Sequence, residues 1–161
     1  MKKLSISLAL TLLATPAWAE KPNRDDLLVF ISQNQLDQNL YNLLAATIPS
    51  TEAGQALYEV CGPLKMEDLF ENGYTHVRKT MGDVWRGALA DVYESHLTDA
   101  DLSRLSALDD TVRLDQISDT LTTEPIINDL RATLSPLVQE ATARQVNHML
   151  DEAEAHCTLG D

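Results

Sequence analysis

Hydrophobic side chains recur every three or four residues over most of the chain, and the clearest run extends from Met66 to Leu97. This spacing places the side chains on one face of an amphipathic α-helix. At about 1.5 Å per residue such a helix is roughly 45 Å long, so it must pack against other helices along its length. We therefore expect a long central helix whose buried face carries Phe70, Tyr74, Val77, Met81, Val84, Ala88 and Val92, widened by Trp85 and Leu89.

Three glycines lie within this run, at Gly73, Gly82 and Gly87. In a helix interior each weakens the helix by roughly 1 kcal/mol relative to alanine. Gly82 follows Met81 directly and marks either a bend or a close helix crossing, and the pattern does not decide between the two.

The residues before the central helix predict shorter helical elements. Asn23 is a good N-cap for a helix that begins at Arg24. After a polar interruption at residues 32–35, the apolar pattern resumes and continues to Pro49, where a helix should stop. Two short helices or one bent helix fit this pattern equally well. A turn follows, and then another short helical piece through Tyr58.

Capping signals also divide the second half of the chain. Thr98 and Asp101 have the spacing of a capping box at the start of a helix. A change in the apolar phase around Asp109 predicts a break. A final helix then begins near Pro125, since proline is tolerated in a first turn, and Pro136 either kinks or restarts it.

This final helix continues to Cys157, and no alternating pattern of the kind that predicts β-strands is found anywhere in the chain. There is also no internal repeat or low-complexity linker. The sequence therefore predicts an all-α fold, an irregular or orthogonal helical bundle around one long central helix.

The first residues have the pattern of a targeting segment. Two lysines precede a short apolar run at residues 4–13, and Ala17-Trp18-Ala19 provides the small residues of a cleavage site. The run is far shorter than the ~20 residues that span a bilayer. We expect residues 1–19 to be a signal peptide and residues 20–161 to form a single helical domain without a transmembrane anchor, located in the periplasm or outside the cell.

The chain is strongly acidic, with 25 Asp and Glu residues against 12 Lys and Arg residues and a net charge of −13. Without the two lysines of the signal peptide, 10 basic residues remain against 25 acidic ones, a net charge of −15. Nucleic acids and anionic membranes are bound through clustered Lys and Arg, so we exclude both as partners. The simplest interpretation of the acidic excess is a well-solvated surface.

The exported chain contains two cysteines, Cys61 and Cys157. In an oxidising compartment an even count without metal-ligand spacing predicts one disulfide. Cys61 lies in a predicted chain reversal at Gly62-Pro63, and Cys157 follows an apolar helical stripe. A bridge across about 95 residues stabilises the fold by roughly 4–5 kcal/mol if it acts on chain entropy. The alternative is a reactive thiol pair, which is normally closer in sequence or beside a base.

The stretch from Trp85 to Leu108, WRGALADVYESHLTDADLSRLSAL, resembles a family of secreted bacterial helical proteins known as the domain of unknown function 2059. In that family a long helix with an aromatic end leads into an acidic-capped helix, and residues 26–44 are similar to the family's opening helices. The chain departs from the family at residues 107–112, where an aromatic pair is expected. The resemblance implies a helical extracytoplasmic domain without known chemistry. The matching positions are Tyr93, Leu97, Thr98, Asp101 and Leu102.

Two constellations are candidate ligand sites. His148, Glu152 and His156 follow one helical stripe at steps of four and are plausible zinc or copper ligands. This stripe lies away from the apolar side of the helix, defined by Val146, Met149, Leu150 and Ala153, so a solvated face with incidental histidines is favoured. We expect no cofactor.

The second candidate is a groove lined by Tyr74, Trp85 and Tyr93, although aromatic residues at helical spacing are more often part of a core. A basic cluster lies in the same region and either receives an anion or balances charge, and charge balance is the favoured interpretation. This cluster consists of His76, Arg78, Lys79 and Arg86.

No catalytic, phosphate-binding or calcium-binding motif is present in the sequence. We expect a non-enzymatic binding or structural module that presents apolar residues to a protein, a peptide or an apolar ligand. One alternative is a hydrolase that assembles His76 or His96 with a carboxylate on folding. A third is an acid-responsive chaperone that exposes apolar surface below about pH 4, where carboxylates protonate.

Overall fold

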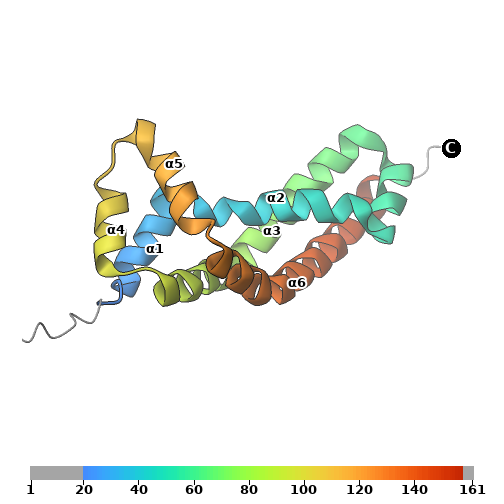
Figure 1. The fold of residues 1–161 in the computed structure, drawn as a ribbon. Helices are drawn as coiled ribbons and strands as arrows, with labels where there is room; N and C mark the ends of the chain where they lie inside the picture. The colour runs from blue at the N-terminus through green and yellow to red at the C-terminus, as the bar shows by residue number, and fades with distance from the viewer. Residues whose placement is uncertain (1–19, 158–161) are drawn as a thin grey trace, which may run out of the picture.

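The computed structural model describes residues 20–157, and this part of the chain is helical without a β-strand (Figure 1). The predicted all-α fold class is confirmed. The predicted signal peptide, residues 1–19, lies outside the described residues. The helices are α1 (Arg24–Gln33), α2 (Asn39–Thr47), α3 (Glu52–His96), α4 (Asp99–Ser106), α5 (Asp110–Leu121) and α6 (Glu124–His156), with short 3-10 turns at Leu36–Gln38 and Ile48–Ser50.

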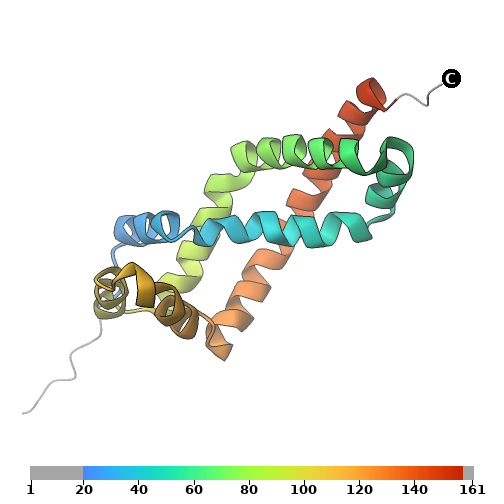
Figure 2. The same cartoon turned by 90° about the horizontal axis from the view of Figure 1, so that it is seen from above.

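Helices α3 and α6 form a long antiparallel pair. Cys61 is bonded to Cys157 at one end of the pair. In the middle, the Gln145 side chain donates to the Phe70 carbonyl at 3.0 Å. The numbers of the paired residues therefore run in opposite directions, as they must in an antiparallel pair. Figure 2 shows α1 and α2 following one another across this pair, while α4 and α5 lie together at one end of the molecule.

Helix α3 changes direction sharply at Gly62, where the sequence predicts a chain reversal. Gly62 has φ +74° and ψ 169°, in a region that glycine adopts far more readily than other residues. Pro63 follows directly, and proline has no N–H to continue the hydrogen bonding of the preceding turn. The kink divides α3 into a short arm, residues 52–61, and a long arm, residues 63–96.

The buried face of the long arm agrees with the predicted one at Val77, Met81, Trp85, Leu89 and Val92 and differs from it at Val84. Val84 is 55% exposed, whereas the adjacent Trp85 is 1% exposed and Leu89 is fully buried. The prediction that Val84 lies on the core face is therefore wrong. The main row of buried residues recurs at steps of four, and Ala90 and Val92 are buried beside it. The row consists of Leu69, Gly73, Val77, Met81, Trp85, Leu89 and Tyr93.

Steps of four make this face wind around the helix, because four residues turn an α-helix by about 400°. Each buried side chain is thus displaced by roughly 40° from the one before it. As a result, the long arm faces α6 near Gly73 and faces the segment that opens α2 near Trp85. Trp85 Nε1 donates to Asn39 Oδ1 at 2.9 Å.

Gly73 marks the close crossing of α3 and α6. A Cβ atom at this position would lie 2.9 Å from Gln145 Cγ and 3.0 Å from Met149 Cγ. At Gly82 the nearest such atom is Arg78 Cγ, at 3.9 Å, which is an ordinary contact. The close crossing is therefore at Gly73 and not at Gly82.

The elements before α3 are separate helices rather than one bent helix. Asn23 Oδ1 accepts from the Asp25 N–H at 2.8 Å, so the predicted cap of α1 is present. Helix α1 ends before Gln35, which has φ +55° in the left-handed region. Thr51 caps the short arm of α3, because its Oγ1 accepts from the Gly54 N–H at 3.0 Å.

Helix α6 is continuous through Pro136, so this proline does not restart it. Met149 is fully buried, and Ala153 is 8% exposed, as the predicted stripe requires. Leu150 is 40% exposed, however, and its predicted place on the core face is wrong. Among the described residues, no helix combines the length and apolarity needed to cross a membrane.

Helix α4 begins with the predicted capping box. Thr98 Oγ1 accepts from the Asp101 N–H at 3.1 Å, and Asp101 Oδ2 accepts from the Thr98 N–H at 3.1 Å. The Thr98 hydroxyl also donates to Asp101 Oδ2 at 2.7 Å. These hydrogen bonds from Thr98 favour the ionised carboxylate and lower the pKa of Asp101.

We expect the stabilisation by this box to disappear in acid. Because the folded pKa of Asp101 is lowered, its contribution is present above the unfolded value of 3.8 and is lost as the pH falls through the folded pKa. Asp101→Asn should cost about 1 kcal/mol in urea unfolding near pH 7, and the difference from wild type should shrink near about pH 2.5. Asp99→Asn, in the same turn but outside the box, is the control. A wild-type advantage that is the same at both pH values would contradict this interpretation.

Candidate functional site

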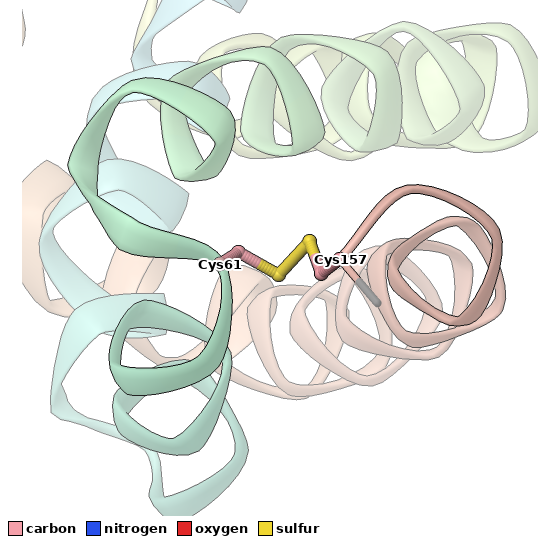
Figure 3. Close-up of a disulfide and its surroundings, with 2 residues drawn as sticks. All are labelled: Cys61 and Cys157. Carbon is pink, nitrogen blue, oxygen red and sulfur yellow. A yellow bond between two sulfur atoms is a disulfide. The ribbon is translucent and has the colours of Figure 1, made fainter. Parts of the chain in front are cut away.

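The Cys61–Cys157 disulfide fixes the kink of α3 to the end of α6 (Figure 3). The two cysteines are separated by 96 positions in the sequence, and their Cα atoms are 5.0 Å apart. Cys61 directly precedes the kink residue Gly62, and Cys157 is the C-cap of α6. The predicted structural disulfide is confirmed. It sets the position of the short arm of α3 relative to the rest of the fold.

Helix α2 and the two arms of α3 enclose a groove with a volume of about 590 Å³. This volume lies within the range of roughly 300–1,000 Å³ that is typical of ligand pockets. We call it the acidic groove, because three glutamates are among the residues that line it. The lining residues are Tyr41, Ala45 and Pro49, then Gly54, Gln55, Tyr58 and Glu59, and finally Met66, Glu67, Phe70 and Glu71.

The wall of the acidic groove is apolar and partly aromatic. The rings of Tyr41 and Phe70 pack edge to face, with centroids 5.3 Å apart. Met66 and Phe70 are partly buried against the core. Tyr58, on the short arm, is 55% exposed, so its ring is accessible to a ligand. Edge-to-face aromatic packing holds the Tyr41–Phe70 side of the wall in place before a ligand binds.

Carboxylates form the polar part of the groove. Glu59 projects from the short arm of α3, and Glu67 and Glu71 project from the long arm. The Tyr41 hydroxyl donates to Glu71 Oε1 at 2.5 Å, and this hydrogen bond is the main reason that the pKa of Tyr41 is raised. The lining contains no lysine, arginine or histidine. The groove therefore has a negative potential, which attracts a cationic ligand.

This combination suits the binding of an apolar ligand that carries a positive charge. An apolar wall takes up a hydrophobic body, and the carboxylates pair with a positive charge attached to it. No serine, cysteine or histidine is among the residues that line the acidic groove, so a Ser-His or Cys-His pair is not found in its lining.

The three aromatic residues predicted to share a groove do not share one. Tyr74 and Trp85 line a separate pocket, which has Tyr41 in common with the acidic groove and is more polar. We call it the polar pocket. Tyr93 lines neither pocket and is 5% exposed, and its burial raises its pKa to about 12. The acidic groove itself was not predicted, because its residues come from parts of the chain that only the kink at Gly62 brings together.

The predicted metal-ligand stripe packs against α3. Glu152 accepts from Asn72 Nδ2 at 3.1 Å, and the ring of His148 stacks on His76 with centroids 4.5 Å apart. The side chains of His148 and Glu152 are 30% and 28% exposed, so this face is partly solvated and partly in contact with α3. His148 Nε2 lies 3.6 Å from Glu152 Oε1, and the side chain of His156 is outside the described part. Within the described residues, no three potential metal ligands of the His, Cys, Asp and Glu types come together.

One of the two histidines named in the hydrolase alternative, His96, meets a carboxylate. His96 Nε2 lies 2.7 Å from Asp129 Oδ2, where the end of α3 meets the start of α6. The neighbouring Ser95 hydroxyl donates to the Val92 carbonyl at 2.7 Å and is thus engaged with its own helix. Neither His96 nor Asp129 lines the acidic groove or the polar pocket. This pair therefore serves as a contact between the two long helices.

Comparisons with the models of known protein families, with curated proteins and with solved structures found no match to this chain. The resemblance to the domain of unknown function 2059 thus stays a prediction.

Proposed function

We propose that this protein is an exported, non-enzymatic binding module that takes an apolar, positively charged ligand in the acidic groove. The ligand class that fits best is a basic peptide segment with an aromatic or aliphatic side chain between lysines or arginines. The observation that carries the proposal is the position of Glu59, Glu67 and Glu71 around one apolar wall. Export is supported by the targeting pattern of residues 1–19 and by the disulfide between distant cysteines.

The expected affinity is modest and depends on salt. Burying one aromatic or large aliphatic side chain contributes about 1.5–3 kcal/mol. Each exposed ion pair adds up to about 1 kcal/mol, and salt screens it. After the cost of ordering a peptide, we expect a dissociation constant on the order of 0.01–1 mM.

The test is a titration with a labelled short peptide in which lysine alternates with leucine and tryptophan. We expect Glu59→Gln/Glu67→Gln to weaken binding at least fivefold, because two charge pairs are lost while the apolar wall is kept. The control, Asp115→Asn/Asp119→Asn, removes the same charge from α5 and should change the affinity less than twofold. Fluorescence anisotropy of the labelled peptide gives both values.

The same titration separates the proposal from nonspecific attraction by an acidic surface. Raising the salt from about 50 mM to about 500 mM should weaken binding, and a peptide with glutamate in place of lysine should not bind. A peptide that keeps its lysines but has serine in place of leucine and tryptophan should also lose most of its affinity. Equal weakening by the groove variant and the α5 variant would overturn the proposal.

A further inference from the structure

The polar pocket beside Tyr41 has a volume of about 290 Å³ and is lined by the turn after α1, by α2 and by the long arm of α3. Tyr41 lines both this pocket and the acidic groove. Its ring packs edge to face on Tyr74, with centroids 4.8 Å apart. The polar pocket is thus a separate cavity with a shared aromatic wall, and its chemistry differs from that of the groove.

Two arginines give this pocket a positive character. Arg78 and Arg86 both line it, two helical turns apart on the long arm of α3. The only carboxylate in the lining is that of Asp37, and Arg86 Nε lies 3.4 Å from its Oδ2. Arg86 Nη2 also lies 3.4 Å from Asp83 Oδ1, outside the lining, so two carboxylates balance Arg86 and the charge of Arg78 is the one available to an anion. A positive charge at this place in an acidic chain favours the binding of an anion that carries a single negative charge.

The rest of the lining contains aromatic rings and several side chains that can donate hydrogen bonds. The indole of Trp85 is 1% exposed and is fixed by its hydrogen bond to Asn39. Tyr74 adds a second ring, and Gln35, Gln38 and Asn42 add side-chain amides. Gln35 lies in the left-handed region at φ +55°, which costs a residue with a Cβ about 1–2 kcal/mol. The fold thus tolerates an unfavourable backbone at the edge of this pocket, as is common at ligand sites.

We infer that the polar pocket binds a small monocarboxylate with a planar apolar body, of the class of aromatic acids. Arg78 pairs with the carboxylate, because its exposed guanidinium presents several N–H donors and is not held by Asp37. The planar body lies against the ring of Tyr74, and the buried Trp85 forms part of the pocket wall. A pocket of this size, at the lower end of the usual range, suits a single ring. This site and its ligand are distinct from those of the acidic groove.

Trp85 provides the signal for the test. Of the two tryptophans in the sequence, Trp18 lies in the expected signal peptide, so Trp85 is the single reporter in the exported protein. Phenylacetate is the probe, phenylacetamide is its uncharged counterpart, and benzylamine carries the opposite charge. We expect phenylacetate to give a saturable change in Trp85 emission, with the other two compounds at least tenfold weaker.

Variants at two adjacent residues then assign the site. Arg78→Gln should weaken phenylacetate binding about tenfold, and because Arg78 is exposed the substitution should leave the fold intact. Lys79→Gln removes the same charge from a residue that does not line the pocket and should change the affinity less than twofold. Equal binding of phenylacetate and phenylacetamide, equal weakening by both variants, or no saturation would each overturn the inference.

Discussion

Replacing both Cys61 and Cys157 by alanine should lower the free energy of unfolding by about 4–5 kcal/mol. The bridge joins residues separated by 96 positions, and a loop of that length loses this amount of conformational entropy in the unfolded chain. The loss is large relative to the 5–15 kcal/mol that typically stabilises a domain. Urea unfolding followed by circular dichroism, with the double variant and the oxidised wild type at the same pH, measures it.

Reduction of the wild-type protein is the control, because it breaks the bridge without removing the sulfur atoms. Reduced wild type and the double variant should unfold at similar urea concentrations. Reduction should also weaken peptide binding, since the short arm of α3 is no longer tied to the end of α6 and the acidic groove loses one wall. A reduced protein as stable as the oxidised one, to within about 0.5 kcal/mol, would show that the bridge does not stabilise the fold.

Trp85→Ala should cost about 3–5 kcal/mol, the second-largest effect that we expect. The indole is 1% exposed in the core, and its Nε1 donates to Asn39 Oδ1 at 2.9 Å. Removal of the ring leaves a cavity and also leaves the Asn39 acceptor without this donor. Trp85→Phe retains most of the volume and should cost less, about 1–3 kcal/mol. Urea unfolding of each variant gives these values.

The matched control is Val84→Ala, at the adjacent position on the same helix. Val84 is 55% exposed, so its truncation should change the stability by no more than about 0.5 kcal/mol. The difference between the stability losses of Val84→Ala and Trp85→Ala therefore shows which face of α3 is buried. Similar losses at Val84 and Trp85 would mean that the helix is rotated relative to the arrangement described here.

Helix boundaries were predictable where a local signal sets them. Asn23 and the Thr98–Asp101 box make hydrogen bonds within a few residues, so a short stretch of sequence contains all the information. The phase of the buried face was less predictable. Val84 and Trp85 are adjacent and both apolar, and the choice between them depends on where α2 and α6 lie, which the periodicity of one helix does not determine.

The candidate site was hidden for a related reason. Tyr41 lies on α2, and Glu59 and Glu67 lie on the two arms of α3, so the groove that they line depends on the turn at Gly62. The sequence did identify the disulfide that fixes this turn, since both cysteines are the only ones in the chain. Two of the three aromatic residues predicted to share a groove, Tyr74 and Trp85, do line the polar pocket, because they lie on one helix. Tyr93 lies two turns further along the same helix and is buried in the core.

The most direct test of the account is a nuclear magnetic resonance titration of the isotopically labelled, oxidised protein with the lysine-, leucine- and tryptophan-containing peptide. If the peptide binds in the acidic groove, chemical shift changes concentrate at the residues that line it, above all Tyr41, Tyr58, Met66 and Phe70. Changes spread evenly over the acidic surface, or confined to α5, would contradict this expectation, because the peptide would then be attracted by net charge rather than held by the groove.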